Sequence, residues 1–213
     1  ERRRWRAVRR GGLRMPDAGR AALLRLSAAL GTRHAGAIRA EMEVARGEAD
    51  ARAVEEVILQ AHLFIGFPDA LNALGTWRAV SGLPAPAESD EDPAAWQARG
   101  ERVCAEVYGA NYAKLRENVR GLHPDVDGWM VTGGYGRVIG RPGLDLKTRE
   151  LCIAALLAVW KVPRQLHSHL RGALNAGASV QEVDAAVEIA CGFLEPDEAA
   201  SVHALWGEIR AKR

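Results

Sequence analysis

Two ionisable side chains lie on faces of predicted helices that are otherwise apolar. In the first of these helices, apolar residues recur every three or four positions from Leu146, and Glu150 falls within their stripe. The next helix opens at Pro163 and ends at Gly177, and His169 falls within its stripe. Because a buried ionisable group is costly unless it is paired or changes protonation, we expect the carboxylate and the imidazole to be neighbours.

A buried carboxylate–imidazole pair can perform acid–base chemistry. The carboxylate orients the ring and stabilises its charge, and the ring then donates or accepts a proton. Each side chain also has a plain structural interpretation: His169 as a satisfied core residue, and Glu150 as a partner of the helix dipole. Neither stripe holds another ionisable group, and this favours a functional pair. We predict His169 as the proton donor and Glu150 as the residue that sets its protonation and orientation.

Five nearby residues are candidates for binding a substrate. Gln165 lies one helical turn before the imidazole, so its amide is expected to reach the same pocket. Arg164 and Arg171 are suited to holding a substrate carboxylate through forked hydrogen bonds. Tyr135 and Trp129, in DGWMVTGGYG, are candidate walls of that pocket. The plain alternatives are a surface glutamine, solvated arginines and aromatic core packing.

Composition excludes several classes of protein. The 213 residues carry a net charge of +2 and are 48% hydrophobic, which is ordinary for a globular protein and unlike a dedicated nucleic-acid binder. The basic segment ERRRWRAVRR is interpreted as a solvated arm. We expect no membrane-spanning segment and no signal peptide. The cysteines, Cys104, Cys152 and Cys191, lack zinc-type spacing, so we expect buried thiols in the cytoplasm, no metal and no cofactor.

Helical periodicity dominates the chain, and alternating strand patterns are nearly absent. This predicts an all-α protein. Helices are predicted at about 17–30, 34–46, 50–65, 69–80, 92–119, 125–139, 147–160, 163–176, 180–193 and 197–211. Between them, SGLPAPAESDEDP combines proline, glycine, serine and acids, and is typical of a linker.

The two sides of this linker share an order of elements and of Pro, Asp, Ala and Trp residues. An offset of roughly 130 residues relates them, which indicates a degenerate internal repeat. At this offset the carboxylate position falls on Arg20 or Ala18, and the imidazole position on Arg39 or Ala37, so the first half lacks the pair. The predicted organisation is a degenerate N-terminal repeat at 1–80, a linker at 81–95, and a C-terminal repeat carrying the site at 96–213.

The segments YGRVIGRPGLDLKTREL and QLHSHLRGALNAGAS resemble the signature of the carboxymuconolactone decarboxylase family. That family lies in the all-helical superfamily that also contains the alkylhydroperoxidase D proteins. In the first half, EEVILQAHLFIGFPDALNAL resembles the closing helices of the same unit. The resemblance implies an alkylhydroperoxidase D-like helical fold, with two degenerate repeats in one chain.

The peroxidase branch of this superfamily uses two cysteines between its Glu and its His. At the matching positions this chain has Val162 and Gln165, between Glu150 and His169. Thiol–disulfide chemistry needs a thiolate and a resolving partner. The sequence therefore argues against a thiol-dependent peroxidase.

The resemblance implies a cofactor-independent decarboxylase, or a related lactone-acting enzyme, of the kind found in aromatic degradation. Its substrate would be a small carboxylated lactone or β-keto acid. The alternative is a catalytically inactive member of the family that serves as a binding or assembly module. The resemblance also implies a homo-oligomer, with a trimer favoured, while the charge and the apolar pattern described above predict no nucleic-acid or membrane partner. The apolar helix that ends in GFPDALNALGTW, with Trp77 near its end, is the expected interface anchor.

Overall fold

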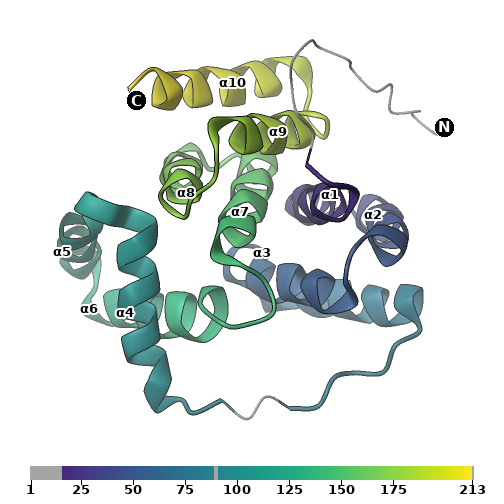
Figure 1. Cartoon of the computed structure of the whole chain (residues 1–213), viewed down its shortest axis with the longest axis horizontal. Helices are drawn as coiled ribbons and strands as arrows, with labels where there is room; N and C mark the ends of the chain where they lie inside the picture. The colour runs from purple at the N-terminus through teal and green to yellow at the C-terminus, as the bar shows by residue number, and fades with distance from the viewer. Residues whose placement is uncertain (1–15, 89–90, 213) are drawn as a thin grey trace.

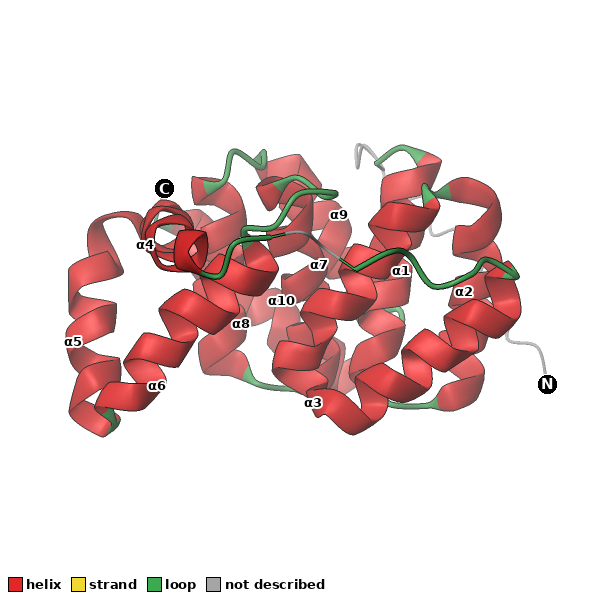
Figure 2. Cartoon of the chain, turned by 90° about the horizontal axis from the view of Figure 1, so that it is seen from below, coloured by secondary structure: helices red, strands yellow, loops and turns green. Residues whose placement is uncertain are grey.

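The computed structural model describes residues 16–88 and 91–212, and these residues form helices and connecting loops without a strand (Figure 2). The all-α prediction is confirmed. The basic N-terminal arm lies outside the described residues. The helices are α1 Ala18–Thr32, α2 Ala35–Glu48, α3 Ala51–Ser81, α4 Ala94–Tyr108, η1 Gly109–Asn111, α5 Tyr112–Leu122, α6 Pro124–Trp129, η2 Met130–Ile139, α7 Leu146–Trp160, α8 Pro163–Asn175, α9 Val180–Cys191 and α10 Pro196–Ala211.

Polar side chains set the beginnings of several helices. Asp17, Asp50, Asp145 and Ser179 each accept a hydrogen bond from a backbone N–H in the first turn of α1, α3, α7 and α9, respectively. Such caps satisfy N–H groups that have no partner within the helix. The predicted helix starts therefore lie close to the observed ones.

One predicted boundary is confirmed and another differs from the structure. Residues 50–65 and 69–80 were expected to form separate helices, and the backbone of α3 is non-helical between them, at Gly66, with φ 80° and ψ 169°. This backbone conformation suits glycine, and Pro68 follows within the helix. The helix expected at 92–119 is instead broken between α4 and α5 by the short 3₁₀ turn η1, which begins at Gly109 with φ 53°.

Helix α3 corrects the expectation that no segment is long and apolar enough to span a membrane. An 18-residue window within Ala51–Ser81 has a mean hydropathy of 1.3, and 39% of that window is buried. By length and composition this helix could cross a membrane. This is weak evidence, because core helices of globular proteins meet the same criteria.

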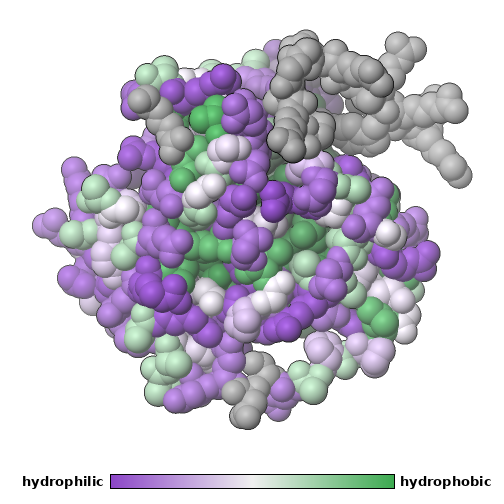
Figure 3. Space-filling view, in the orientation of Figure 1, coloured by the Kyte–Doolittle hydropathy of each residue, from purple (hydrophilic) through white to green (hydrophobic). Residues whose placement is uncertain are grey.

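Helix α7 lies at the centre of the molecule, with α1, α8 and α9 packed against it (Figure 1). Every residue from 148 to 159 is buried, as expected of a helix that is apolar on nearly all sides. Its contact with α1 is close at Gly31, where an added Cβ would lie 2.6 Å from the Leu156 carbonyl oxygen. The face in Figure 3 is mostly polar, and apolar residues show through near its centre.

The two halves share structural details that support the proposed repeat. Helices α1 and α7 each contain 15 residues, and the non-glycine residues that follow them, Arg33 and Lys161, have φ values of 57° and 62°. The starts of these two helices, residues 18 and 146, set an offset of 128 residues. In that register Ala22 and Glu41, rather than Arg20 and Arg39, match the acid and the imidazole.

In each half, the indole N–H of a tryptophan also donates a hydrogen bond to a carboxylate. The Trp77 Nε1–H donates to Glu55 within α3 at 3.3 Å, and the Trp206 Nε1–H donates from α10 to Asp184 of α9 at 2.6 Å. Trp77 is only 1% exposed, so it packs inside its own chain. Trp77 itself is therefore not the exposed part of the helix that was expected to anchor an interface.

A buried ionic network joins the halves. The Arg149 guanidinium of α7 is fully buried and lies 2.9 Å from the Glu56 carboxylate of α3, which is 3% exposed. Arg141 also pairs with Glu56, at 3.0 Å, and the Gln60 side chain exchanges hydrogen bonds with Arg149. Because burying such charges is favourable only with close partners, this network holds α3 and α7 in one fixed arrangement.

Candidate functional site

The hairpin of α7 and α8 positions the acid and the imidazole. Asp145 accepts the Thr148 N–H at 2.9 Å and so fixes the start of α7. At the other end, Lys161 takes the left-handed conformation that turns the chain, and Pro163 opens α8. The two helices therefore pack against each other with their apolar stripes facing inward.

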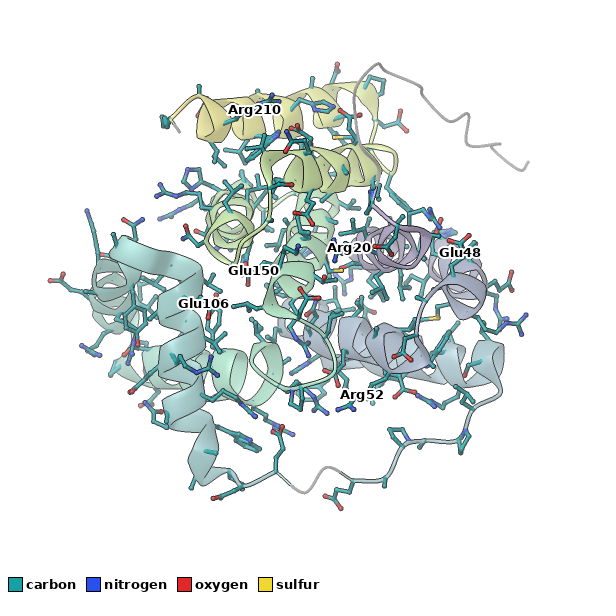
Figure 4. All side chains as sticks on the ribbon, in the orientation of Figure 1. Arg20, Glu48, Arg52, Glu106, Glu150 and Arg210 are labelled. Atoms are coloured by element: carbon teal, nitrogen blue, oxygen red, sulfur yellow. The ribbon has the colours of Figure 1, made fainter. Side chains whose placement is uncertain are left out.

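Glu150 and His169 meet in the interior of this hairpin. The His169 Nδ1 lies 2.8 Å from Glu150 Oε2, a hydrogen-bond distance, and Figure 4 labels Glu150 on α7 in the interior of the molecule. Glu150 is fully buried and His169 is 5% exposed. The Nε2 atom of the ring makes no hydrogen bond with the described residues. One ring nitrogen of His169 is thus hydrogen-bonded to the acid, and the other has no hydrogen-bond partner among the described residues.

The second oxygen of the acid has no partner. Glu150 Oε1 is the sole buried side-chain nitrogen or oxygen without a hydrogen bond among the residues that the structure describes. A buried acceptor without a partner is costly, so proteins seldom keep one without a use for it. The site therefore combines a fixed carboxylate–imidazole contact with two polar atoms, Glu150 Oε1 and His169 Nε2, that have no hydrogen-bond partner among the described residues.

Gly172 makes room for the acid. It lies one turn after His169 on α8, and an added Cβ would lie 2.5 Å from Glu150 Oε2 and 2.7 Å from Val107 Cγ1. Both distances are shorter than a real Cβ tolerates. Only a glycine fits here without displacing the carboxylate.

One aromatic ring contacts the pair, and two others lie close enough to feel the charge of Glu150. The Phe64 ring of α3 meets the His169 ring edge-on, with centroids 5.8 Å apart and an interplanar angle of 86°. Tyr108 at the end of α4 and Tyr135 of η2 form a second edge-on contact at 6.0 Å. Burial raises the pKa of Tyr108 to about 12 and raises the pKa of Tyr135, and the charge of Glu150 adds to both. Both phenols therefore stay neutral near pH 7.

The three cysteines are free. Burial raises the pKa of the Cys104, Cys152 and Cys191 thiols to about 12 in each case. A thiol reacts as its thiolate, so these groups are poorly suited to redox chemistry. Within the described ranges, no three His, Cys, Asp or Glu residues gather closely enough to hold a metal ion.

The structure places the five predicted binding residues in different surroundings. Tyr135 is 4% exposed and packs in the core beside the pair, as described above. Trp129 is 69% exposed, so the expectation that it walls a pocket or packs in the core is wrong. Gln165 and Arg164 lie on the exposed surface of the first turns of α8, and neither hydrogen-bonds to the pair. Arg171 is also exposed, but it lines a hollow.

This α5–α8 hollow has a volume of about 300 Å³. It is lined by Val107, Tyr108, Asn111, Lys114, Leu115, Asn118, His167, Ser168, Arg171 and Asn175. A second cavity of about 150 Å³ lies along α3, between apolar side chains, Arg137 and Arg141. Neither Glu150 nor His169 lines either cavity. Val107 and Tyr108, however, are shared between the α5–α8 hollow and the surroundings of the pair.

Sequence reasoning missed three residues of the site. Gly172 carries a signal, because it follows His169 by three positions and thus shares its face of the helix. Tyr108 and Phe64 carry none. They come from helices far from the hairpin in sequence, and only the tertiary packing brings them to the pair.

Comparisons with known proteins match a segment of the chain that includes the hairpin of α7 and α8. Residues 124–205 match the model of the carboxymuconolactone decarboxylase family. Over 147 residues the chain is 27% identical to Peroxisomal protein 2 of Schizosaccharomyces pombe. That alignment covers 64% of this chain and 66% of the yeast protein, slightly less than two thirds of its length. The segment that matches the family model contains both Glu150 and His169.

Proposed function

We propose that the chain catalyses a cofactor-independent decarboxylation of a small carboxylated lactone or β-keto acid. The observation that carries this proposal is the buried 2.8 Å contact between His169 Nδ1 and Glu150 Oε2, which leaves the ring's Nε2 without a partner. A pair of this kind can deliver a proton to a carbanion or enolate. The match of residues 124–205 to the family model supports the same chemistry.

In the proposed reaction, the bond between the carboxylate carbon and the substrate carbon breaks and releases carbon dioxide. The electron pair of that bond moves into the adjacent carbonyl or unsaturated lactone, giving an enolate. His169 then transfers the Nε2 proton to carbon and takes up another from water, while Glu150 holds the Nδ1–H and stabilises the charged ring. A placed acid of this type accelerates a reaction by roughly 10²–10⁴-fold.

The test is carbon dioxide release, screened across carboxylated lactones and β-keto acids with the whole chain. We expect release with at least one substrate and a loss of about 100-fold or more in His169→Ala. Arg39→Ala, on an exposed ion pair of α2, is a matched control and should keep full activity. No release with any substrate of either class would contradict the proposal.

One observation favours a second candidate function, that of a catalytically inactive binding or assembly module. Neither of the two cavities is lined by Glu150 or His169, and the His169 side chain is 7% exposed. In a module, the pair would serve only to hold α7 against α8. His169→Ala would then lower the stability of the fold, with no activity to lose.

We further propose that the chain assembles with copies of itself, with a trimer favoured, through the exposed face of α3. Leu63 lies before the kink at Gly66 and is 36% exposed, and Phe67 and Leu71 lie after it and are 66% and 62% exposed. Exposed apolar side chains of this size are typical of an interface. Light scattering should give a trimer that Phe67→Glu dissociates, while Leu122→Glu, at an 85% exposed position of α5, leaves it intact. A wild-type monomer at micromolar concentration would overturn this assembly.

The cytoplasm is the proposed location, supported by the three free cysteines. The name of the yeast relative states a peroxisomal location for that protein, and this makes the peroxisome the alternative. Microscopy of a fluorescent fusion, compared with a peroxisomal marker, decides between them.

A further inference from the structure

The α5–α8 hollow carries positive charge without compensation. Lys114 of α5 and Arg171 of α8 line it, and neither makes an ion pair or a hydrogen bond with any residue of the described ranges. No Asp or Glu is among its lining residues. Elsewhere on the surface many arginines are paired, as Arg20 is with Glu182 at 2.8 Å. Two unpaired cations at one concave site are typical of a site that receives an anion.

The pKa of His167, another lining residue, is also affected by nearby cations. It lines the hollow one turn before Arg171, and burial, Arg171 and Lys212 lower its pKa, while Glu208 of α10 acts in the opposite direction. The net effect is a lowered pKa, with burial as the largest cause and the two cations acting in the same direction. The ring therefore stays neutral near pH 7 and can donate or accept a hydrogen bond.

The remaining walls define the shape and polarity of the ligand. The side chains of Asn111 and Asn118 make no hydrogen bonds with the described residues, so their amides are free to donate. Val107 and Leu115 add apolar surface, and Tyr108 adds an aromatic ring. At about 300 Å³, the hollow is at the small end of ligand sites. Apolar surface beside unpaired cations suits an organic anion better than an inorganic one.

We propose that the α5–α8 hollow binds a small organic carboxylate, whose anionic group is held by Arg171 and Lys114 and whose apolar body packs on Val107, Leu115 and Tyr108. Binding there does not depend on turnover, so the proposal stands apart from the decarboxylase proposal. The site adjoins the buried acid through Val107, because both Val107 and Glu150 border the space beside Gly172. A ligand in the hollow is thus one side chain away from the Glu150 carboxylate.

The experiment is a titration of the whole chain with benzoate, followed by calorimetry and by shifts of the asparagine side-chain amides in NMR. Benzoate should bind and shift the amides of Asn111 and Asn118. Arg171→Gln should weaken binding by about tenfold or more, because it removes a charge-assisted hydrogen bond. Arg164→Gln is the matched control: it removes an arginine from the same helix that does not line the hollow, and binding should be unchanged.

Three further results separate the outcomes. Inorganic phosphate should bind at least several-fold more weakly than benzoate, and equal binding would contradict an organic carboxylate as the ligand class. His169→Ala should bind benzoate as the wild type does, so a failure of the decarboxylase proposal leaves this one intact. No binding of benzoate at tens of millimolar, or an equal loss in Arg164→Gln and Arg171→Gln, would overturn the site.

Discussion

The contact between Glu150 and His169 depends on a neighbouring residue that has no side chain. An added Cβ at Gly172 would lie 2.5 Å from Glu150 Oε2, the oxygen that contacts the imidazole. The acid is fully buried and cannot move outward into water. The geometry of the pair is therefore set as much by Gly172 as by its own two members.

We predict that Gly172→Ala displaces the carboxylate, lowers turnover and destabilises the fold by about 1–3 kcal/mol through overpacking. Gly207→Ala is the matched control, because nothing lies within 4 Å of the added Cβ at that helical position. There alanine should be neutral or slightly stabilising. Thermal unfolding and carbon dioxide release check both variants, and Gly172→Ala with wild-type stability and activity would refute this role of the glycine.

At this scale the sequence predicts the pair but not its surroundings. Ionisable residues in apolar stripes are visible in a pattern, because the pattern itself states which face of a helix is buried. Gln165 was expected beside the imidazole, one turn before it. It is exposed because the first turns of α8 lie nearer to solvent than the middle of that helix, a difference that periodicity does not register.

At the scale of the helices, ion pairs of Glu182 link the start of α9 to α1 and α7. Its carboxylate receives the Arg20 guanidinium of α1 at 2.8 Å and the Lys147 ammonium of α7 at 2.9 Å. It also accepts the Ser179 N–H at 2.8 Å, in the capping box of α9. Burial raises the pKa of this carboxyl, but the hydrogen bonds from Ser179 and Lys147 outweigh it and lower the pKa to about 2.

A lowered pKa in the folded state means that the ionised form of Glu182 stabilises the protein. This stabilisation is present above the ordinary pKa of 4.5 and is lost as the pH falls towards about 2. Glu182→Gln should lower the free energy of unfolding at pH 7 by on the order of 1–3 kcal/mol. Denaturant unfolding from pH 7 to pH 2 should show the difference from wild type shrinking below pH 4.5.

The control is Glu43→Gln, in an exposed pair with Arg39 on α2 whose atoms lie 3.8 Å apart. Such pairs contribute little, so its stability should follow wild type at every pH. A Glu182→Gln deficit that stays constant down to pH 2 would show that the carboxylate charge is not the cause.

Sequence patterns predict most helices of this protein because their starts carry caps and their faces carry periodicity. The break within α3 was predicted, and the backbone is non-helical there at Gly66, with φ 80°. The patterns fail where one residue changes the backbone without such a signal. Gly109, with φ 53°, opens the 3₁₀ turn that interrupts the helix predicted at 92–119. A glycine in a sequence permits such a conformation but does not require it.

In the whole molecule, the two halves share one core and one buried ion pair. Arg149 and Glu56, 2.9 Å apart, come from opposite sides of the linker. The N-terminal half also sends Phe64 against the His169 ring. The first half therefore positions the site even though its own residues in the matching register, Ala22 and Glu41, do not form such a pair.

We predict that Arg149→Met destabilises the chain by about 3–5 kcal/mol, because it leaves the Glu56 carboxylate buried with only Arg141 as an ionic partner. The double variant Arg149→Met, Glu56→Met should recover much of this loss, because no buried charge is left unpaired. Denaturant unfolding of the two single variants and the double variant measures the coupling. Additive losses would mean that the pair does not act as a unit.

This network was not predicted, for a physical reason. Arg149 adjoins Glu150 in sequence and lies about 100° around α7 from it, so periodicity alone assigns it to a polar face. It is fully buried because α7 is covered on all sides by other helices, including those of the first half. Only the arrangement of both halves reveals this burial.

The central claim is that Glu150 and His169 act together in turnover. The most direct measurement is kcat/KM for carbon dioxide release in wild type, Glu150→Gln, His169→Ala and the double variant, on the best substrate of the screen. Each single variant should lose about 100-fold or more, and the double variant should be little worse than either, because the two residues act as one unit. Full activity in His169→Ala, or losses that multiply in the double variant, would contradict it.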